Sequence, residues 1–182
     1  MPESRLRAEE DALFLLLELN DALFPIGAYA HSYGLETYVQ QGCVHDAATA
    51  GKWLRAYFSG SFLYGELLSA RLAYEAFGEP DGLEKLLELE AEVRAARVPR
   101  ETREALQHYL YAQLSALTNT CVKLIPLSQT DGARLVASFR TCYSAYIDRA
   151  LAAEADDLCL SSPGLDIRAM QHEVLYSRLY MS

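Results

Sequence analysis

Apolar residues recur at helical spacing along almost the whole chain, and no long stretch alternates apolar and polar residues as a half-buried strand does. Turn-forming and capping residues separate the apolar stretches, as they do at helix ends. The pattern predicts an all-α fold, a single-domain bundle of about six to eight helices with mostly antiparallel neighbours. The predicted helices cover roughly residues 13–24, 30–41, 47–59, 62–77, 81–98, 100–125, 129–153 and 166–180.

Individual residues mark several of the predicted helix boundaries. Gly42 follows the second helix, where a left-handed residue often ends a helix. Asp46 is a suitable N-cap for the third helix, and Ser128 or Thr130 for the long helix that ends near residue 153. Pro163 and the glycine after it are expected to separate that helix from the last one.

The composition fits one globular domain spanning residues 1–182, with a flexible N-terminus at about residues 1–8. Hydrophobic residues make up 51% of the chain, enough for one sizeable core. The formal net charge of -9 opposes binding to nucleic acid or to an anionic membrane surface. No uncharged stretch approaches the ~20 residues of a membrane-spanning helix. The four cysteines contain no Cys-x-x-Cys pair, which is typical of a cytoplasmic protein.

Catalytic motifs are weak in this sequence. No Gly-rich loop with a Lys-Ser or Lys-Thr pair is present to hold a phosphate. The stretch 27–34 resembles a nucleophile elbow around Ser32 only loosely, because Ala30 replaces the first glycine and no strand precedes it. The simpler interpretation is that small residues allow two helices to approach closely, with His31 and Ser32 in hydrogen bonds. No catalytic residue and no cofactor is therefore predicted.

One short segment carries candidate metal ligands. Cys43 and His45, followed by Asp46, place a thiol, an imidazole and a carboxylate within four residues, and such groups suit borderline divalent metals. A stable site generally needs further ligands and supporting hydrogen bonds. The alternative is a cysteine at a helix junction beside an N-cap aspartate.

Two other segments are candidates for contacts with partner proteins. The stretch from Lys123 to Gly132 joins two apolar helices through a turn with one cation and several polar groups, although Pro126 and Ser128 could simply end one helix and cap the next. The C-terminal helix, about residues 165–182, has apolar groups around much of its circumference. It either packs within its own domain or docks on a partner. In the second case its anchors are Tyr176, Leu179 and Tyr180.

Three blocks of sequence resemble the UreF family of urease accessory proteins. The blocks are residues 21–36, with a Pro-x-Gly turn and a Ser-x-Gly-Leu-Glu motif, residues 122–132, and residues 165–179. They occur in the family's order, with helical segments between them. The motif residues of the first block are Pro25, Gly27, His31, Ser32, Gly34 and Glu36.

The resemblance implies an all-α, non-catalytic maturation factor, a chaperone for nickel insertion into urease. It implies a homodimer that binds UreD, called UreH in some organisms, recruits and regulates the GTPase UreG, and acts on the urease apoprotein in the cytoplasm. In the family the terminal Ser-Arg-Leu segment is thought to support the Lys-x-x-Pro loop. That role carries over to Arg178, supporting Lys123, Pro126 and the neighbouring Gln129, since arginine can donate to several backbone carbonyls at once.

The chain departs from the family pattern in three places. Ala133 stands where many relatives have glutamine, and Ala169 where a serine is common, so each is expected to lack a polar contact. Family members also have further helices between segments like 97–103 and 109–115, which are joined almost directly here. Either the sequence as given lacks a stretch near residues 102–107, or the protein has lost it.

Overall fold

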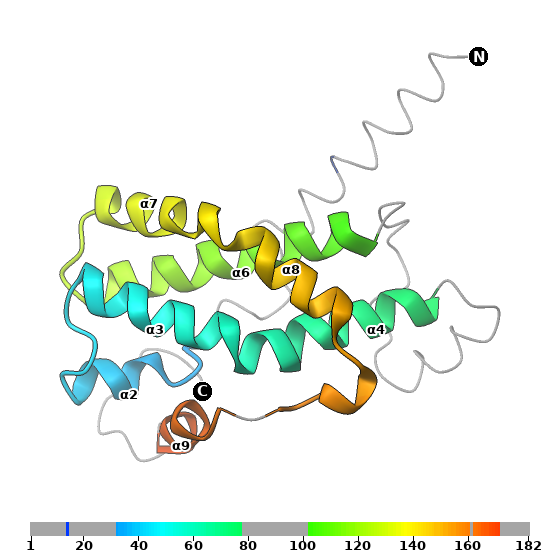
Figure 1. Cartoon of the computed structure of the whole chain (residues 1–182). Helices are drawn as coiled ribbons and strands as arrows, with labels where there is room; N and C mark the ends of the chain where they lie inside the picture. The colour runs from blue at the N-terminus through cyan, green and yellow to red at the C-terminus, as the bar shows by residue number, and fades with distance from the viewer. Residues whose placement is uncertain (1–13, 15–31, 78–101, 161, 172–182) are drawn as a thin grey trace.

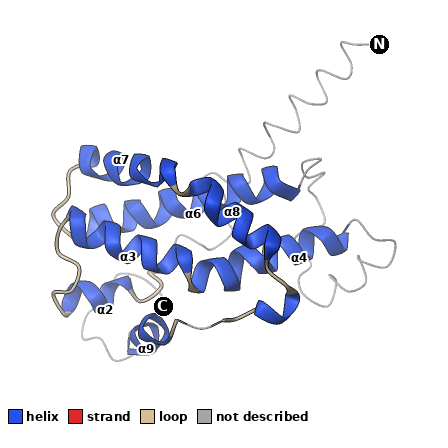
Figure 2. Cartoon of the chain, viewed as in Figure 1, coloured by secondary structure: helices blue, strands red, loops and turns tan. Residues whose placement is uncertain are grey.

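The computed structural model of the chain describes residues 14, 32–77, 102–160 and 162–171. These residues form helices and connecting turns, with no strand in the described ranges, which confirms the all-α prediction (Figure 2). The predicted helices near 13–24 and 81–98, and the last part of the C-terminal helix, lie outside the described residues. The elements are α2 (Leu35–Gln40), α3 (Ala47–Ser59), the π-helix η2 (Phe62–Leu67), α4 (Leu68–Phe77), α6 (Thr102–Leu124), α7 (Gln129–Ser138), the 3-10 turn η4 (Phe139–Thr141), α8 (Tyr143–Ala152), the 3-10 turn η5 (Ala155–Asp157) and α9 (Pro163–Gln171).

The long helices lie alongside one another in a bundle. In Figure 1, α3, η2 and α4 follow one another as a single rod beside α6; α7 lies along the other side of α6, and α8 crosses α6 to contact η2 and α4. The short helices α2 and α9 lie together under the start of the rod. Within the described residues, no helix is both long enough and apolar enough to cross a membrane.

An aromatic cluster occupies the centre of the core. Phe58 and Phe62 are fully buried, and their ring centroids are 4.8 Å apart in an edge-to-face arrangement. Tyr57 stacks on Trp53 at 5.5 Å, and Phe139 of η4 packs edge-to-face on Phe58 at 5.8 Å. These rings join α3, η2 and η4 in one core.

Several predicted helix boundaries are confirmed. The Asp46 carboxylate accepts from the Thr49 backbone N–H at 2.8 Å and caps α3. Ser128 caps α7 in a reciprocal capping box with Asp131. Gly42 lies just beyond α2 with φ +71°, the left-handed conformation expected there.

Three other boundaries were predicted wrongly. The second helix begins at Leu35 and not near residue 30, because the chain forms a turn at residues 32–34. The helix predicted to run to residue 153 divides at Phe139, where Ser138 and Cys142 donate to backbone carbonyls and so compete with helical hydrogen bonding. Pro163 begins α9, since proline suits the first turn of a helix, where its missing N–H is not needed.

Candidate functional site

The turn before α2 brings the first and third motif blocks into contact. Tyr33 and Gly34 both have left-handed backbone conformations, with φ +50° and +79°. A Cβ on Gly34 would lie only 2.9 Å from the backbone nitrogen of Ala169 in α9. The glycine of the Ser-x-Gly-Leu-Glu motif is therefore required by both its conformation and its contact. The close helix approach that the small residues of this stretch predict occurs here.

Polar contacts hold α9 against α2. The Thr37 hydroxyl donates to the Arg168 carbonyl at 3.0 Å, and the Tyr38 hydroxyl donates to the Gly164 carbonyl at 3.0 Å. The Arg168 guanidinium lies 4.5 Å from the centroid of the Tyr38 ring and donates to the Gln41 amide oxygen at 3.3 Å. Residues 163–171 thus pack within their own domain.

The outer side of α9 is nevertheless apolar and open. Ile167 is 54% exposed and Met170 is 76% exposed. The described part of the C-terminal helix therefore packs on α2 along its inner face, and docking of its outer face on a partner stays a prediction. Arg178, Tyr176, Leu179 and Tyr180 lie outside the described residues, so their roles stay predictions.

Two motif residues of the first block are buried beside the turn. Ser32 is fully buried, and its hydroxyl has no hydrogen-bond partner within the described chain, contrary to expectation. A serine so enclosed cannot reach a substrate, so the structure gives no support to Ser32 as the nucleophile of the elbow that this stretch loosely resembles. Glu36 is 3% exposed in the first turn of α2. Pro25, Gly27 and His31 lie outside the described residues.

The loop between α6 and α7 presents side chains at one end of the bundle. Lys123, Pro126 and Gln129 are all exposed. Ile125 between them is buried and anchors the loop, while Ser128 caps α7. The loop therefore both ends one helix and begins the next, while Lys123, Pro126 and Gln129 remain on the surface.

Gly132, in the second motif block, allows α7 to pack closely on α6. Gly132 is buried, and a Cβ on it would lie 2.9 Å from the Val122 side chain.

The two residues noted as departures from the family pattern differ in setting. Ala133 is exposed on α7, whereas Ala169 is half-buried with its backbone against Gly34.

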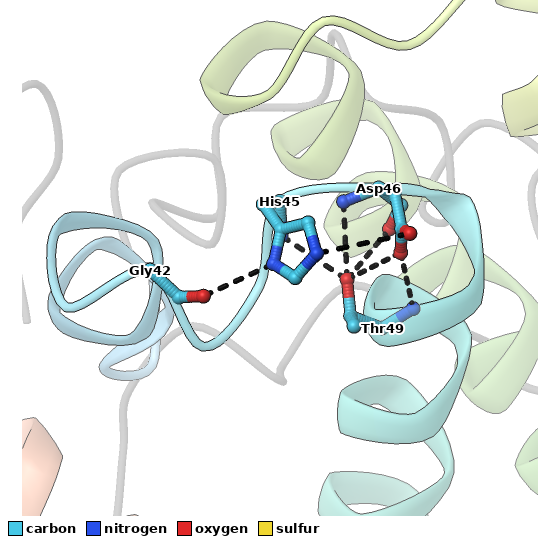
Figure 3. A network of polar contacts seen from close by, with 4 residues as sticks. All are labelled: Gly42, His45, Asp46 and Thr49. Atoms are coloured by element: carbon cyan, nitrogen blue, oxygen red, sulfur yellow. Dashed lines mark hydrogen bonds and ion pairs between the residues drawn. The ribbon is translucent and has the colours of Figure 1, made fainter.

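The candidate metal ligands are used in local contacts, and Figure 3 shows those of His45 and Asp46. His45 Nδ1 lies 3.0 Å from the Gly42 carbonyl oxygen, and His45 Nε2 lies 3.8 Å from the Asp46 carboxylate. Hydrogen bonds from Thr49 lower the pKa of Asp46 and hold its carboxylate in the helix cap. The Cys43 thiol faces the Gln41 carbonyl at 4.0 Å. Across the described residues, no three potential ligands converge.

A partly buried cluster of one carboxylate and three tyrosines was missed by the sequence analysis. The Glu66 carboxylate accepts from the Tyr57 hydroxyl at 2.8 Å and from the Tyr109 hydroxyl at 3.0 Å. Tyr33 of the motif turn lies against Tyr57 with ring centroids 5.2 Å apart. Burial, reinforced by Glu66, raises the pKa of all three tyrosines, that of Tyr33 to about 12. The only signal in the sequence is a single acid inside the apolar stretch 62–68.

Comparisons with known proteins give one consistent family. The model of the family described as UreF matches residues 44–107 and 102–140. The urease accessory protein UreF of Arthrobacter sp. (strain FB24) is 32% identical over 215 aligned positions, which cover 92% of this chain and 96% of that protein. The proteins of the same name from Actinobacillus pleuropneumoniae serotype 5b and Lachnoclostridium phytofermentans are 30% and 28% identical, each with 92% of this chain and 97% of the relative covered.

These alignments are longer than the chain. The one with the Arthrobacter protein extends over 215 positions against 182 residues here, so the relative contains residues with no counterpart in this sequence. The two stretches matched by the family model overlap at 102–107, where the chain is expected to be shorter than its relatives. Helix α6 runs continuously through this point, from Thr102 to Leu124.

Proposed function

Because the chain belongs to the UreF family of urease accessory proteins, we propose that it acts as a non-catalytic adaptor in urease maturation. The observation that carries the proposal is the contact between the first and third motif blocks, together with the exposed loop of the second. The turn at Gly34 fixes α9, and the loop from Lys123 to Gln129 presents side chains at the surface. Such surfaces suit an adaptor, whose task is to hold other proteins in place.

The proposed partners are UreD or UreH, the GTPase UreG and the urease apoprotein, in the cytoplasm, with the chain as a homodimer. Arg178 would support the Lys123–Pro126 loop and so help to recruit UreG and regulate its GTP hydrolysis. Tyr176, Leu179 and Tyr180 would anchor the UreD-type protein. Support comes from the exposure of the loop and from α9, which is held firmly on α2 immediately before these residues.

Co-purification tests the adaptor role directly. The full chain is co-expressed with UreD-type protein and UreG, with and without GTP, and the complexes are isolated through a tag on UreD. We expect all three proteins to co-purify. Failure of the unaltered chain to bind either protein would overturn the proposed function.

Arg178→Ala tests the role of the loop. The variant should lose UreG from the complex while the circular dichroism of the chain stays unchanged. Arg134→Ala is the matched control, because Arg134 is exposed on α7 and, in the described part of the chain, its guanidinium pairs only with Asp131, at 3.5 Å. Normal recruitment of UreG by Arg178→Ala would contradict the assigned role.

The alternative function, a small metal-binding protein using Cys43 and His45, is tested separately. Equilibrium dialysis of the purified chain against nickel should show no stoichiometric site that depends on Cys43. The Asp46 carboxylate already caps α3, which leaves the thiol and the imidazole without this third ligand. Tight binding abolished by Cys43→Ser would favour the alternative.

A further inference from the structure

A groove opens between α3, the end of α2 and the start of α9. Its volume is about 580 Å³, within the range of protein cavities that hold ligands or large side chains. One face of α3 forms its floor, with residues spaced three and four apart turned toward it. These floor residues are Thr49, Lys52, Trp53, Ala56, Ser59 and Gly60.

The walls of the groove are largely apolar. Tyr38 and Val44 form one side, and Pro163 and Leu165 of α9 form the other. Among the described residues that line it, Lys52 is the one with a charged side chain, although the chain as a whole carries a net charge of -9. The groove is therefore a locally basic, apolar site on an acidic protein.

The apolar surface continues out of the groove along α9. Pro163, Ile167 and Met170 are spaced four and three residues apart, so they lie on one side of the helix. Ile167 and Met170 are more than half exposed. A small molecule would fill the concave part alone, whereas a protein segment can cover both the groove and the convex stripe beside it.

We infer that the groove and the stripe on α9 together form a docking surface for an apolar segment with a carboxylate, supplied by a partner accessory protein. The carboxylate would pair with Lys52, since a basic or neutral segment would leave that ammonium without a counter-charge as it loses water. A large apolar side chain would enter the groove beside Ala56 and Trp53. This inference rests on the proposed function, because it assigns a surface to the UreD-type partner.

Variants of the groove test the inference against a matched surface. Lys52→Glu reverses the charge, and Ala56→Trp fills the groove; both positions are exposed on α3, so the fold is expected to tolerate them. The controls are Arg140→Glu and Ala137→Trp, which make the same changes in a second cavity of about 440 Å³ between α6 and α7. Circular dichroism and thermal unfolding report whether each variant folds.

The readout is the dissociation constant for the UreD-type protein. Lys52→Glu and Ala56→Trp should each weaken binding by about tenfold or more, while both controls stay within about twofold of the unaltered chain. Added salt should also weaken binding by the unaltered chain more steeply than binding by Lys52→Gln, because the variant has no charge at position 52 for the salt to screen.

The outcomes separate the inference from the function on which it rests. Binding by the unaltered chain with normal affinity in both groove variants would overturn the docking surface and leave the adaptor role standing. Equal loss of affinity in the groove variants and in the controls would also overturn the docking surface. Absence of any complex with the unaltered chain would overturn the proposed function and the docking surface with it.

Discussion

Gly34 meets two structural requirements. Its backbone is left-handed, and its contact with α9 leaves no room for a side chain. Its φ of +79° disfavours any other residue, and the Ala169 nitrogen leaves no room for a Cβ. We expect Gly34→Ala to lower the free energy of unfolding by about 2–4 kcal/mol, since backbone strain and a displaced helix add together. Urea denaturation measures the loss.

Gly42 supplies a matched control for that prediction. Its φ is +71°, but nothing lies within 4 Å of the position that its Cβ would take. Gly42→Ala should therefore cost only the conformational part, about 1 kcal/mol. Equal losses in the two variants would show that the contact with α9 contributes nothing.

Glu66 is stabilised inside the bundle by two tyrosine hydroxyls. Hydrogen bonds to a charged group contribute about 1.5–3 kcal/mol each, and a hydroxyl left without its acceptor carries a desolvation cost. Glu66→Leu should therefore destabilise the chain strongly. In a double-mutant cycle, Tyr57→Phe should cost much less in the Glu66→Leu background than in the unaltered chain. Additive losses would mean that the hydroxyl and the carboxylate do not interact.

At the level of the helix, the cap of α7 is the simplest contact to test. The Ser128 hydroxyl accepts from the Asp131 backbone N–H at 3.1 Å and satisfies one of the free donors of the first turn. Ser128→Ala should cost about 1 kcal/mol, measured as a lower midpoint of urea denaturation. Ser144→Ala, an exposed change within α8, should leave the midpoint unchanged or raise it slightly.

The π-helix between α3 and α4 is an element that periodicity could not reveal. A π-turn inserts one extra residue and rotates the helix that follows. Here Glu66 lies within it and contacts Tyr109 of α6. An apolar pattern predicts which residues are buried, but it does not distinguish a continuous helix from one with a π-turn.

At the scale of the whole molecule, the sequence predicted the helices and their caps better than it predicted which helices contact one another. The caps at Asp46 and Ser128 depend on neighbouring residues, so the sequence was enough to find them. The small residues around Gly34 predict a close helix approach, but only the fold reveals that the partner is α9, more than 130 residues away. The groove around Lys52 was missed for the same reason, because α3 and α9 form it together.

Buried tyrosines should make the stability of the whole molecule depend on alkaline pH. Burial raises the pKa of Tyr33, Tyr143 and Tyr146 from 10.0 to about 12, so each ionises first in the unfolded chain. Their stabilisation is complete below pH 10 and is lost as the pH rises toward about 12. Urea denaturation between pH 9 and 12 should therefore show stability falling with pH.

The steepness with which stability falls with pH shows whether Tyr143 contributes to the loss. Tyr143→Phe removes one of these late-ionising groups, so stability should fall less steeply with pH in the variant, whatever its stability at pH 9. Ser144→Ala is the matched control, since Ser144 is exposed next to Tyr143 on α8 and has no ionisable side chain, so this change should leave the slope as it is. The same slope in both variants would mean that the alkaline loss comes from other groups, and that burial of Tyr143 does not shift its ionisation.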